Sequence, residues 1–93
     1  MPTDSVRLTA VFSGDVQGVG FRYTAIHLAQ GFNVSGYVRN TSDDRVELVA
    51  EGERAELERF LGAVQRKMLG YVRQTDAQWA QATGEFRGFT IRF

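Results

Sequence analysis

The chain has 93 residues, with eleven basic and eleven acidic side chains whose formal charges cancel at pH 7. This length predicts a single domain over residues 1–93, and the neutral balance argues against nucleic-acid and membrane partners in favour of a small molecule. The absence of cysteine excludes disulfides and thiolate metal sites, and the single histidine leaves little with which to bind a metal.

No apolar run reaches the length of a signal peptide, so a cytoplasmic location is expected. Hydrophobic periodicity then predicts seven elements. They are a strand over 6–13, a helix over 21–31, strands over 34–40 and 45–51, a helix over 53–66, and strands over 72–79 and 86–93.

Two of these elements show their pattern most clearly. The first strand alternates apolar and polar residues, and the second helix carries one apolar stripe of Leu57, Phe60, Leu61 and Val64. The strand over 72–79 is polar, with only Val72, Ala77 and Trp79 expected to be buried, and is therefore predicted at a sheet edge. The order predicts the α+β class: a ferredoxin-like α/β sandwich, βαββαβ plus an extra C-terminal strand, with an antiparallel sheet and two helices on one face.

The glycine-rich run from Gly14 to Arg22 joins the first strand to the first helix. Such a turn directs backbone N–H groups and the positive end of a helix dipole to one point, with a guanidinium in the first helical turn. This combination predicts a site for a phosphate or a carboxylate. A nucleotide is not supported, because Tyr23 stands where a dinucleotide fingerprint needs glycine. A turn that is glycine-rich for steric reasons alone is the structural alternative.

A second motif closes the strand over 34–40. Because side chains alternate along a strand, Val34, Val38 and Asn40 share one face, and Tyr37 and Arg39 share the other. Asn40 is thus the polar end of an otherwise apolar row, on the side of the sheet that the helices cover. A structural asparagine that caps the strand end is the alternative to a functional one.

Together the two motifs resemble the signatures of the acylphosphatase family. The pattern Gly-x-Val-Gln-Gly-Val-x-aromatic-Arg is matched without a gap from Gly14 to Arg22, and Gly-aromatic-Val-Arg-Asn is matched from Gly36 to Asn40. The resemblance covers essentially the whole chain. Asn33 and Asp44 stand where the family usually has glycine, and both are expected to adopt a left-handed backbone.

The resemblance implies the hydrolysis of an acyl phosphate to a carboxylate and inorganic phosphate, with inorganic phosphate also an inhibitor. It implies no cofactor, no metal and a monomer. By the family's pattern Arg22 holds the phosphate and Asn40 orients the nucleophilic water. The backbone N–H groups of the phosphate-binding loop are those of Val16, Gln17, Gly18, Val19, Gly20 and Phe21. No side chain is an obvious base, so a phosphate oxygen of the substrate is expected to accept the proton of the water.

Several other polar residues are expected to have no catalytic role. We expect Asp15 to face solvent, because its charge would repel a phosphate. Arg39 is expected at the surface, and the side chain of Gln17 is expected to brace the loop. His27 is expected to be a surface or a packed residue rather than an acid or base.

Two other classes of function are open from the sequence. An RNA-binding module of the same fold is suggested by Arg87-Gly88-Phe89, although Thr90 breaks the aromatic motif. A small-anion sensor could keep the cradle without catalysis. Asn40 argues against the sensor, because a binder needs no water-orienting amide.

Overall fold

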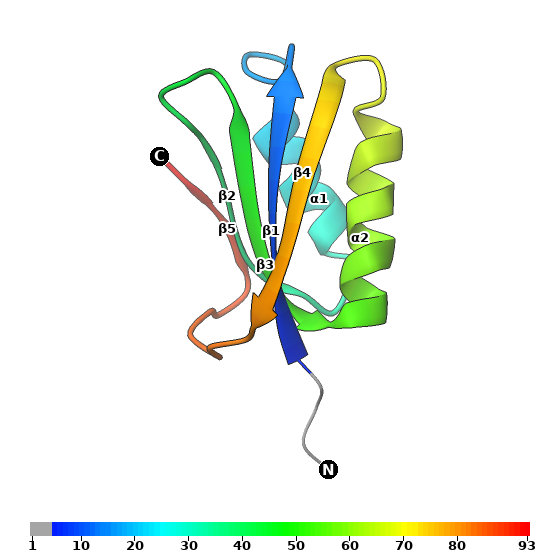
Figure 1. The fold of residues 1–93 in the computed structure, drawn as a ribbon, viewed down its shortest axis with the longest axis vertical. Helices are drawn as coiled ribbons and strands as arrows, with labels where there is room; N and C mark the ends of the chain where they lie inside the picture. Colours follow the sequence, from blue (N-terminus) through cyan, green and yellow to red (C-terminus); the bar gives the residue numbers. More distant parts are fainter. Residues whose placement is uncertain (1–4) are drawn as a thin grey trace.

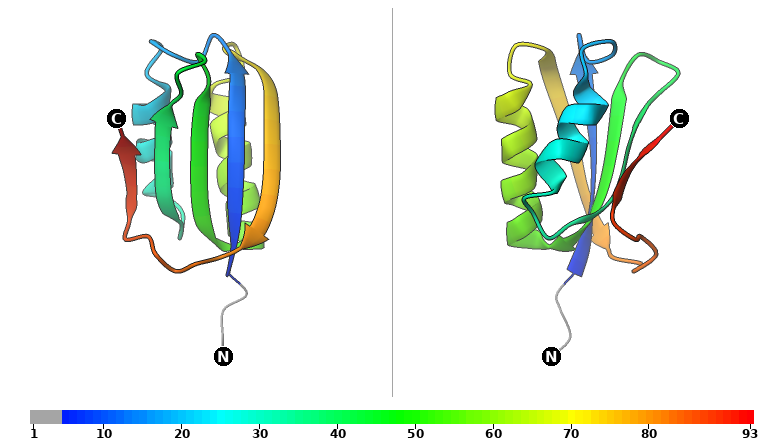
Figure 2. Two further views of the ribbon diagram at one scale, coloured as in Figure 1. Left: turned by 60° about the vertical axis from the view of Figure 1, so that its left-hand side comes forward. Right: turned by 180° about the vertical axis from the view of Figure 1, so that it is seen from behind.

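The computed structural model describes residues 5–93, which form one sheet covered on one face by helices. The first half of the chain contains β1 (Ser5–Gly14), α1 (Phe21–Ala29) and β2 (Ser35–Asn40). The second half contains β3 (Val46–Glu53), α2 (Arg54–Lys67), β4 (Val72–Gln81) and β5 (Phe89–Arg92). Both helices lie on the same face of the sheet, as the two views of Figure 2 show. This is the layer arrangement that the sequence predicts.

The strands lie in the order β4-β1-β3-β2-β5. β1 pairs antiparallel with β3 and β4, and β2 pairs antiparallel with β3. β5 pairs with β2 in the parallel direction, so the sheet is mixed where an entirely antiparallel sheet was expected. The polar strand β4 lies at the edge, as predicted.

The core lies between the sheet and the two helices. The stripe on α2 is confirmed, since Leu57, Phe60 and Val64 are fully buried. The ring of Phe60 on α2 lies 5.6 Å from the ring of Phe32, in the α1–β2 connection. It lies 5.4 Å from the ring of Phe89, the first residue of β5. The strand residues of this core are Leu8, Ala10 and Phe12 from β1, Val38 from β2, and Val46, Leu48 and Ala50 from β3.

The second half of the sheet differs from expectation in two details. β5 begins at Phe89, because residues 82–88 form the connection that crosses from β4 at one edge to β5 at the other. Ala77 is exposed although it pairs with the buried Ala10 on β1, because β4 is the edge strand of the sheet. Trp79 is half-buried, and the guanidinium carbon of Arg54 lies 4.2 Å from its ring centroid.

The two glycine replacements behave differently. Asp44 has φ 66°, so its left-handed conformation is confirmed. Asn33 has no positive φ, so that expectation is wrong. After α1 the chain makes two short turns, with Gly31 N–H donating to Leu28 O and Phe32 N–H to Ala29 O, at 3.0 and 3.1 Å. The N–H of Asn33 then donates to Glu56 Oε2 at 2.9 Å, which satisfies the backbone without a left-handed residue.

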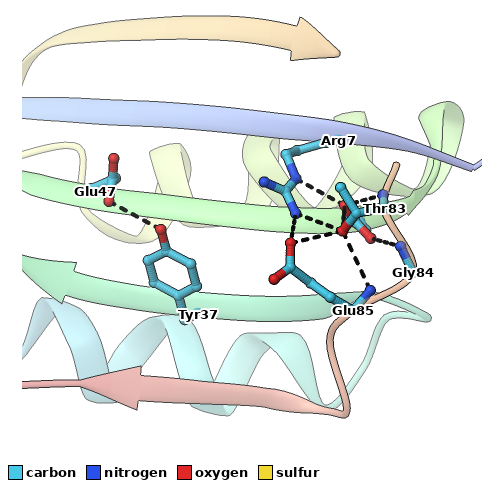
Figure 3. Close-up of polar contacts among 7 residues, drawn as sticks. Arg7, Tyr37, Glu47, Thr83, Gly84 and Glu85 are labelled. Carbon is cyan, nitrogen blue, oxygen red and sulfur yellow. Dashed lines mark hydrogen bonds and ion pairs between the residues drawn. The ribbon is translucent and has the colours of Figure 1, made fainter. Parts of the chain in front are cut away.

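A charged network fastens the crossing connection to the sheet at the end away from the glycine-rich loop (Figures 1 and 3). Glu51 is 5% exposed, and its carboxylate accepts hydrogen bonds from Thr83 N–H at 2.8 Å and Gly84 N–H at 2.9 Å. Arg7 Nε donates a hydrogen bond to the same carboxylate at 2.8 Å. Arg7 Nη2 donates a second hydrogen bond to Glu85 Oε1 at 2.6 Å. Burial alone raises the pKa of Glu51, but these donors outweigh it, and the net pKa lies below the usual value.

The different backbones at Asp44 and Asn33 predict opposite responses to glycine. Asp44→Gly should leave the unfolding free energy unchanged or raise it slightly. Asp44→Ala should lower the unfolding free energy by about 1 kcal/mol, because alanine has the steric strain of the left-handed region without a polar side chain that can form a local hydrogen bond. Asn33→Gly should instead be less stable than Asn33→Ala, by about 0.5–1 kcal/mol. Denaturant unfolding of the four variants measures this, and equal stabilities of glycine and alanine at position 44 would contradict it.

Glu51→Gln should lower the unfolding free energy at pH 7 by about 1–3 kcal/mol, because an amide nitrogen then faces backbone N–H donors. A carboxylate with a lowered folded pKa stabilises fully above its ordinary pKa and loses this contribution as the pH falls through the folded value. The difference between wild type and variant should therefore shrink in acid. Urea titrations at several pH values test this. Glu58→Gln, whose carboxylate lies 3.9 Å from Arg54 at the surface, is the control and should be nearly neutral.

Candidate active site

Loop 15–20 lies at one end of the sheet, between β1 and α1. In Figure 1 the turn between β2 and β3 and the connection between α2 and β4 reach the same end. The N–H of Asp15 donates to Tyr71 O at 2.9 Å, which fixes the start of the loop against the α2–β4 connection. The two predicted site residues come to this end from different elements, Arg22 from the first turn of α1 and Asn40 from the last residue of β2.

Two buried side chains anchor the loop. Val16 is 1% exposed and Phe21 is 2% exposed, and the ring of Phe21 lies 4.9 Å from that of Phe12. Between these anchors Gly18 and Gly20 are exposed and both have φ 77°, a conformation that glycine adopts without steric cost. The backbone can therefore turn sharply while its ends stay fixed in the core.

The loop presents backbone donors that the protein itself does not use. Gly20 caps α1 without a side-chain hydrogen bond, and the first turn carries no acidic residue. The first helical bond runs from Thr24 N–H to Gly20 O at 3.0 Å. Within residues 5–93, the N–H groups of residues 16–20 donate to no protein acceptor. An anion is the natural partner for such a group of N–H donors at a helix N-terminus.

Gln17 ties this loop to the β2–β3 turn. Its Nε2 donates to Thr41 O at 2.9 Å and to Arg45 O at 2.8 Å, so the predicted bracing role is confirmed. The turn has bonds of its own: Thr41 N–H donates to Arg45 O at 2.8 Å, and Arg45 is ion-paired with Asp43. Hydrogen bonds from Arg45 and Thr41 lower the pKa of Asp43 to about 2. Asn40 thus precedes a turn whose position relative to the loop is fixed.

The side chains of Arg22 and Asn40 are both available to a ligand. Arg22 is half-buried and has no carboxylate partner among residues 5–93, and its guanidinium carbon lies 5.1 Å from the ring centroid of Phe93. Asn40 pairs with Val46, which is fully buried on the helix-covered face, so the predicted orientation is confirmed. Its side chain makes no hydrogen bond within the described part of the chain. The contact with Phe93 was not predicted, because no local pattern links the last strand to α1.

Asp15 and Arg39 lie where expected, and of the two positions left open for His27 the structure shows the surface one. Asp15 is exposed, with Arg73 Nη2 3.4 Å from its carboxylate. Arg39 turns away from Asn40 and pairs with Glu47 at 2.7 Å. His27 is exposed on α1. No group of three His, Asp or Glu side chains in residues 5–93 is placed to hold a metal ion.

An α+β sandwich that presents a loop of unpaired N–H groups and an arginine at a helix N-terminus is an arrangement suited to a small anion. The family model named Acylphosphatase matches residues 8–91. The chain therefore belongs to the acylphosphatase family, whose members are hydrolases, and the enzyme class expected from the two motifs is confirmed.

Relatives of nearly equal length support this assignment. The acylphosphatase of Paenarthrobacter aurescens is 42% identical over 92 residues, covering 98% of each chain. That of Acidothermus cellulolyticus is 45% identical over 91 residues, covering 94% of this chain and 87% of the relative. The crystal structure of acylphosphatase from Bacillus subtilis superposes with a TM-score of 0.85 at 29% identity, covering 95% of this chain and 99% of that one. No helix in residues 5–93 is long and apolar enough to cross a membrane.

The position of Gln17 predicts a measurable effect on the loop. Gln17→Ala should lower the unfolding free energy by about 1–2 kcal/mol, because two hydrogen bonds to carbonyls are lost. The amides of residues 41–45 should then exchange with solvent faster, since the β2–β3 turn loses its connection to the loop. Chemical denaturation and hydrogen exchange measure the two effects. Gln78→Ala, at an exposed position on β4, should change stability by less than about 0.5 kcal/mol.

Proposed function

We propose that this protein hydrolyses acyl phosphates to a carboxylate and inorganic phosphate. The proposal is supported by donors without a protein acceptor on elements that end or begin at one end of the sheet: the N–H groups of residues 16–20, Arg22 in the first turn of α1 and Asn40 at the end of β2. Membership of the acylphosphatase family supports the reaction class.

The phosphoryl group is held by the N–H groups of residues 16–21 and by Arg22. An acyl phosphate has a good leaving group, the carboxylate, so the enzyme needs mainly to hold charge and to position a water molecule. Each charge-assisted hydrogen bond to the phosphate contributes about 1.5–3 kcal/mol. Because the loop is anchored by Val16 and Phe21, these donors are already oriented before the substrate binds.

Asn40 orients the attacking water, and a phosphate oxygen of the substrate accepts its proton. The carboxylates near the loop are poorly suited to act as the base. Asp43 has a pKa of about 2 because it is bonded to Arg45, so it takes up protons only weakly near neutral pH. Asp15 is exposed to solvent beside Arg73. A substrate-assisted route needs neither group.

The proposal also covers organisation and setting. We infer that residues 1–93 form one acylphosphatase-like domain that acts as a cytoplasmic monomer without a cofactor, and that inorganic phosphate inhibits it as a product. Gel filtration with light scattering tests the monomer, and competition assays test the inhibition. Addition of a chelator should leave turnover unchanged.

The roles of Arg22 and Asn40 predict different kinetic defects. Arg22→Gln should abolish both activity and inhibition by inorganic phosphate. The glutamine amide lacks the positive charge of the guanidinium and its planar pair of N–H donors. Asn40→Ala should lower kcat about 10²–10³-fold and leave phosphate inhibition intact, because its partner is the water. Asn40→Asp should fail at least as badly at neutral pH, because its charge faces the phosphate.

The measurement is steady-state hydrolysis of benzoyl phosphate, followed by ultraviolet absorbance. Arg39→Gln is the control, because Arg39 is adjacent to Asn40 in sequence but points to the opposite face of the sheet and pairs with Glu47. It should keep near-normal turnover. Wild-type turnover in Asn40→Ala would remove Asn40 from the mechanism and leave an anion sensor as the better description.

A further inference from the structure

The large apolar side chains that the fold leaves exposed gather at one end of the protein. Within residues 5–93 they are Tyr23, Leu69, Tyr71 and Phe93, and the fractions exposed are 65%, 77%, 43% and 97%. Tyr23 lies in the first turn of α1, and Phe93 contacts Arg22. Leu69 and Tyr71 lie in the α2–β4 connection, where Tyr71 O accepts the bond from Asp15 N–H. All four therefore border the end that carries the phosphate loop.

The direction of Tyr23 follows from the helix. The inward stripe of α1 is Phe21, Ala25 and Ala29, so at about 100° per residue Tyr23 lies about 200° around from Phe21, on the side away from the sheet. Side chains on a helix lean toward its N-terminus, so the ring of Tyr23 leans toward the loop end. Its side chain makes no hydrogen bond or ring contact within the described residues.

The in-line geometry of phosphoryl transfer separates the two oxygens of the reaction. The attacking and leaving oxygens lie on opposite sides of phosphorus. Asn40, the proposed guide of the water, is the last residue of β2 and so approaches the loop from the sheet, whereas Tyr23 belongs to α1. The acyl group must then leave on the side away from the sheet, which is the side of Tyr23.

Charge on this end also favours an uncharged acyl group. Arg45 is ion-paired with Asp43, and Arg73 lies 3.4 Å from Asp15, so a carboxylate beside each arginine offsets its charge toward a second anionic group of a substrate. We propose, building on the proposed function, that Tyr23 receives the acyl group and that the enzyme selects acyl phosphates with an aromatic or other apolar acyl group.

Stable phosphonates test this without turnover. Benzylphosphonate and methylphosphonate carry the same anionic head, so their affinities measured by calorimetry isolate the contribution of the apolar group. The wild type should bind benzylphosphonate about 5–20-fold more tightly, as expected for one aromatic contact. In Tyr23→Ala the affinities for benzylphosphonate and methylphosphonate should differ by no more than about twofold. Tyr23→Phe should keep the wild-type ratio of the two affinities.

Leu69→Ala is the matched control, because Leu69 is also a large, exposed apolar side chain but lies in the α2–β4 connection rather than on α1. It should leave the ratio unchanged. Phe93→Ala removes the ring against Arg22 and should alter the affinities of both phosphonates alike. A wild-type ratio in Tyr23→Ala, or a ratio lost in Leu69→Ala, would overturn the assignment of Tyr23.

Hydrolysis supplies the second measurement. The kcat/KM for benzoyl phosphate relative to acetyl phosphate should fall in Tyr23→Ala by about the same 5–20-fold factor. A wild type that binds both phosphonates with the expected ratio but hydrolyses neither acyl phosphate would contradict the proposed function and retain Tyr23 as a ligand contact. Failure of the wild type to bind either phosphonate would overturn the phosphate cradle and this inference together.

Discussion

The side-chain amide of Gln17 joins the two halves of the candidate site. Loop 15–20 follows β1, and Asn40 ends β2, with β3 between the two strands in the sheet. The two bonds from Gln17 to Thr41 O and Arg45 O span this separation at hydrogen-bond distance. The loop and the β2–β3 turn are therefore held in one arrangement, and the spacing of Arg22 and Asn40 depends on it. A site that works by positioning a water molecule requires that rigidity.

The two ends of the sheet use polar groups in opposite ways. At the end where residues 82–88 cross, the buried carboxylate of Glu51 is satisfied by Arg7 and by two backbone N–H groups. At the loop end, the N–H donors, Arg22 and Asn40 have no such partners. Satisfied buried groups hold a fold together, whereas unpaired donors at the surface leave room for a ligand. This contrast points to the same candidate site without use of the family assignment.

The loop itself combines anchored ends with an open centre. Val16 and Phe21 are packed into the core, whereas Gly18 and Gly20 are exposed and left-handed. The apolar anchors hold the N-terminus of α1 in place, and the glycines turn the backbone between them. The exposed ring of Tyr23 then adds an apolar surface in the first turn of α1, next to Arg22. A mixed anhydride of a carboxylic acid and phosphoric acid has the same division into an apolar part and an anionic part.

The sequence by itself determined the elements that depend on local pattern. The α2 stripe, the edge position of β4, the face of Asn40 and the left-handed Asp44 all follow from periodicity or from residue type, and each is confirmed. The two motifs also identified the family. The roles of Arg22, Asn40 and the loop N–H groups remain predictions until variants are measured.

Tertiary structure decided what depends on contacts between distant segments. The connection from β4 crosses to the other edge at the end of the sheet where β4 finishes. The chain therefore enters β5 in the direction opposite to β4, which is the direction of β2, and the two strands pair in parallel. Asn33 avoids a left-handed backbone because its N–H finds Glu56 on α2. The two carbonyl acceptors of Gln17 and the ring of Phe93 against Arg22 also come from other elements. Local periodicity predicts which face of an element is apolar. It does not predict which residue of another element accepts the hydrogen bond of a given donor.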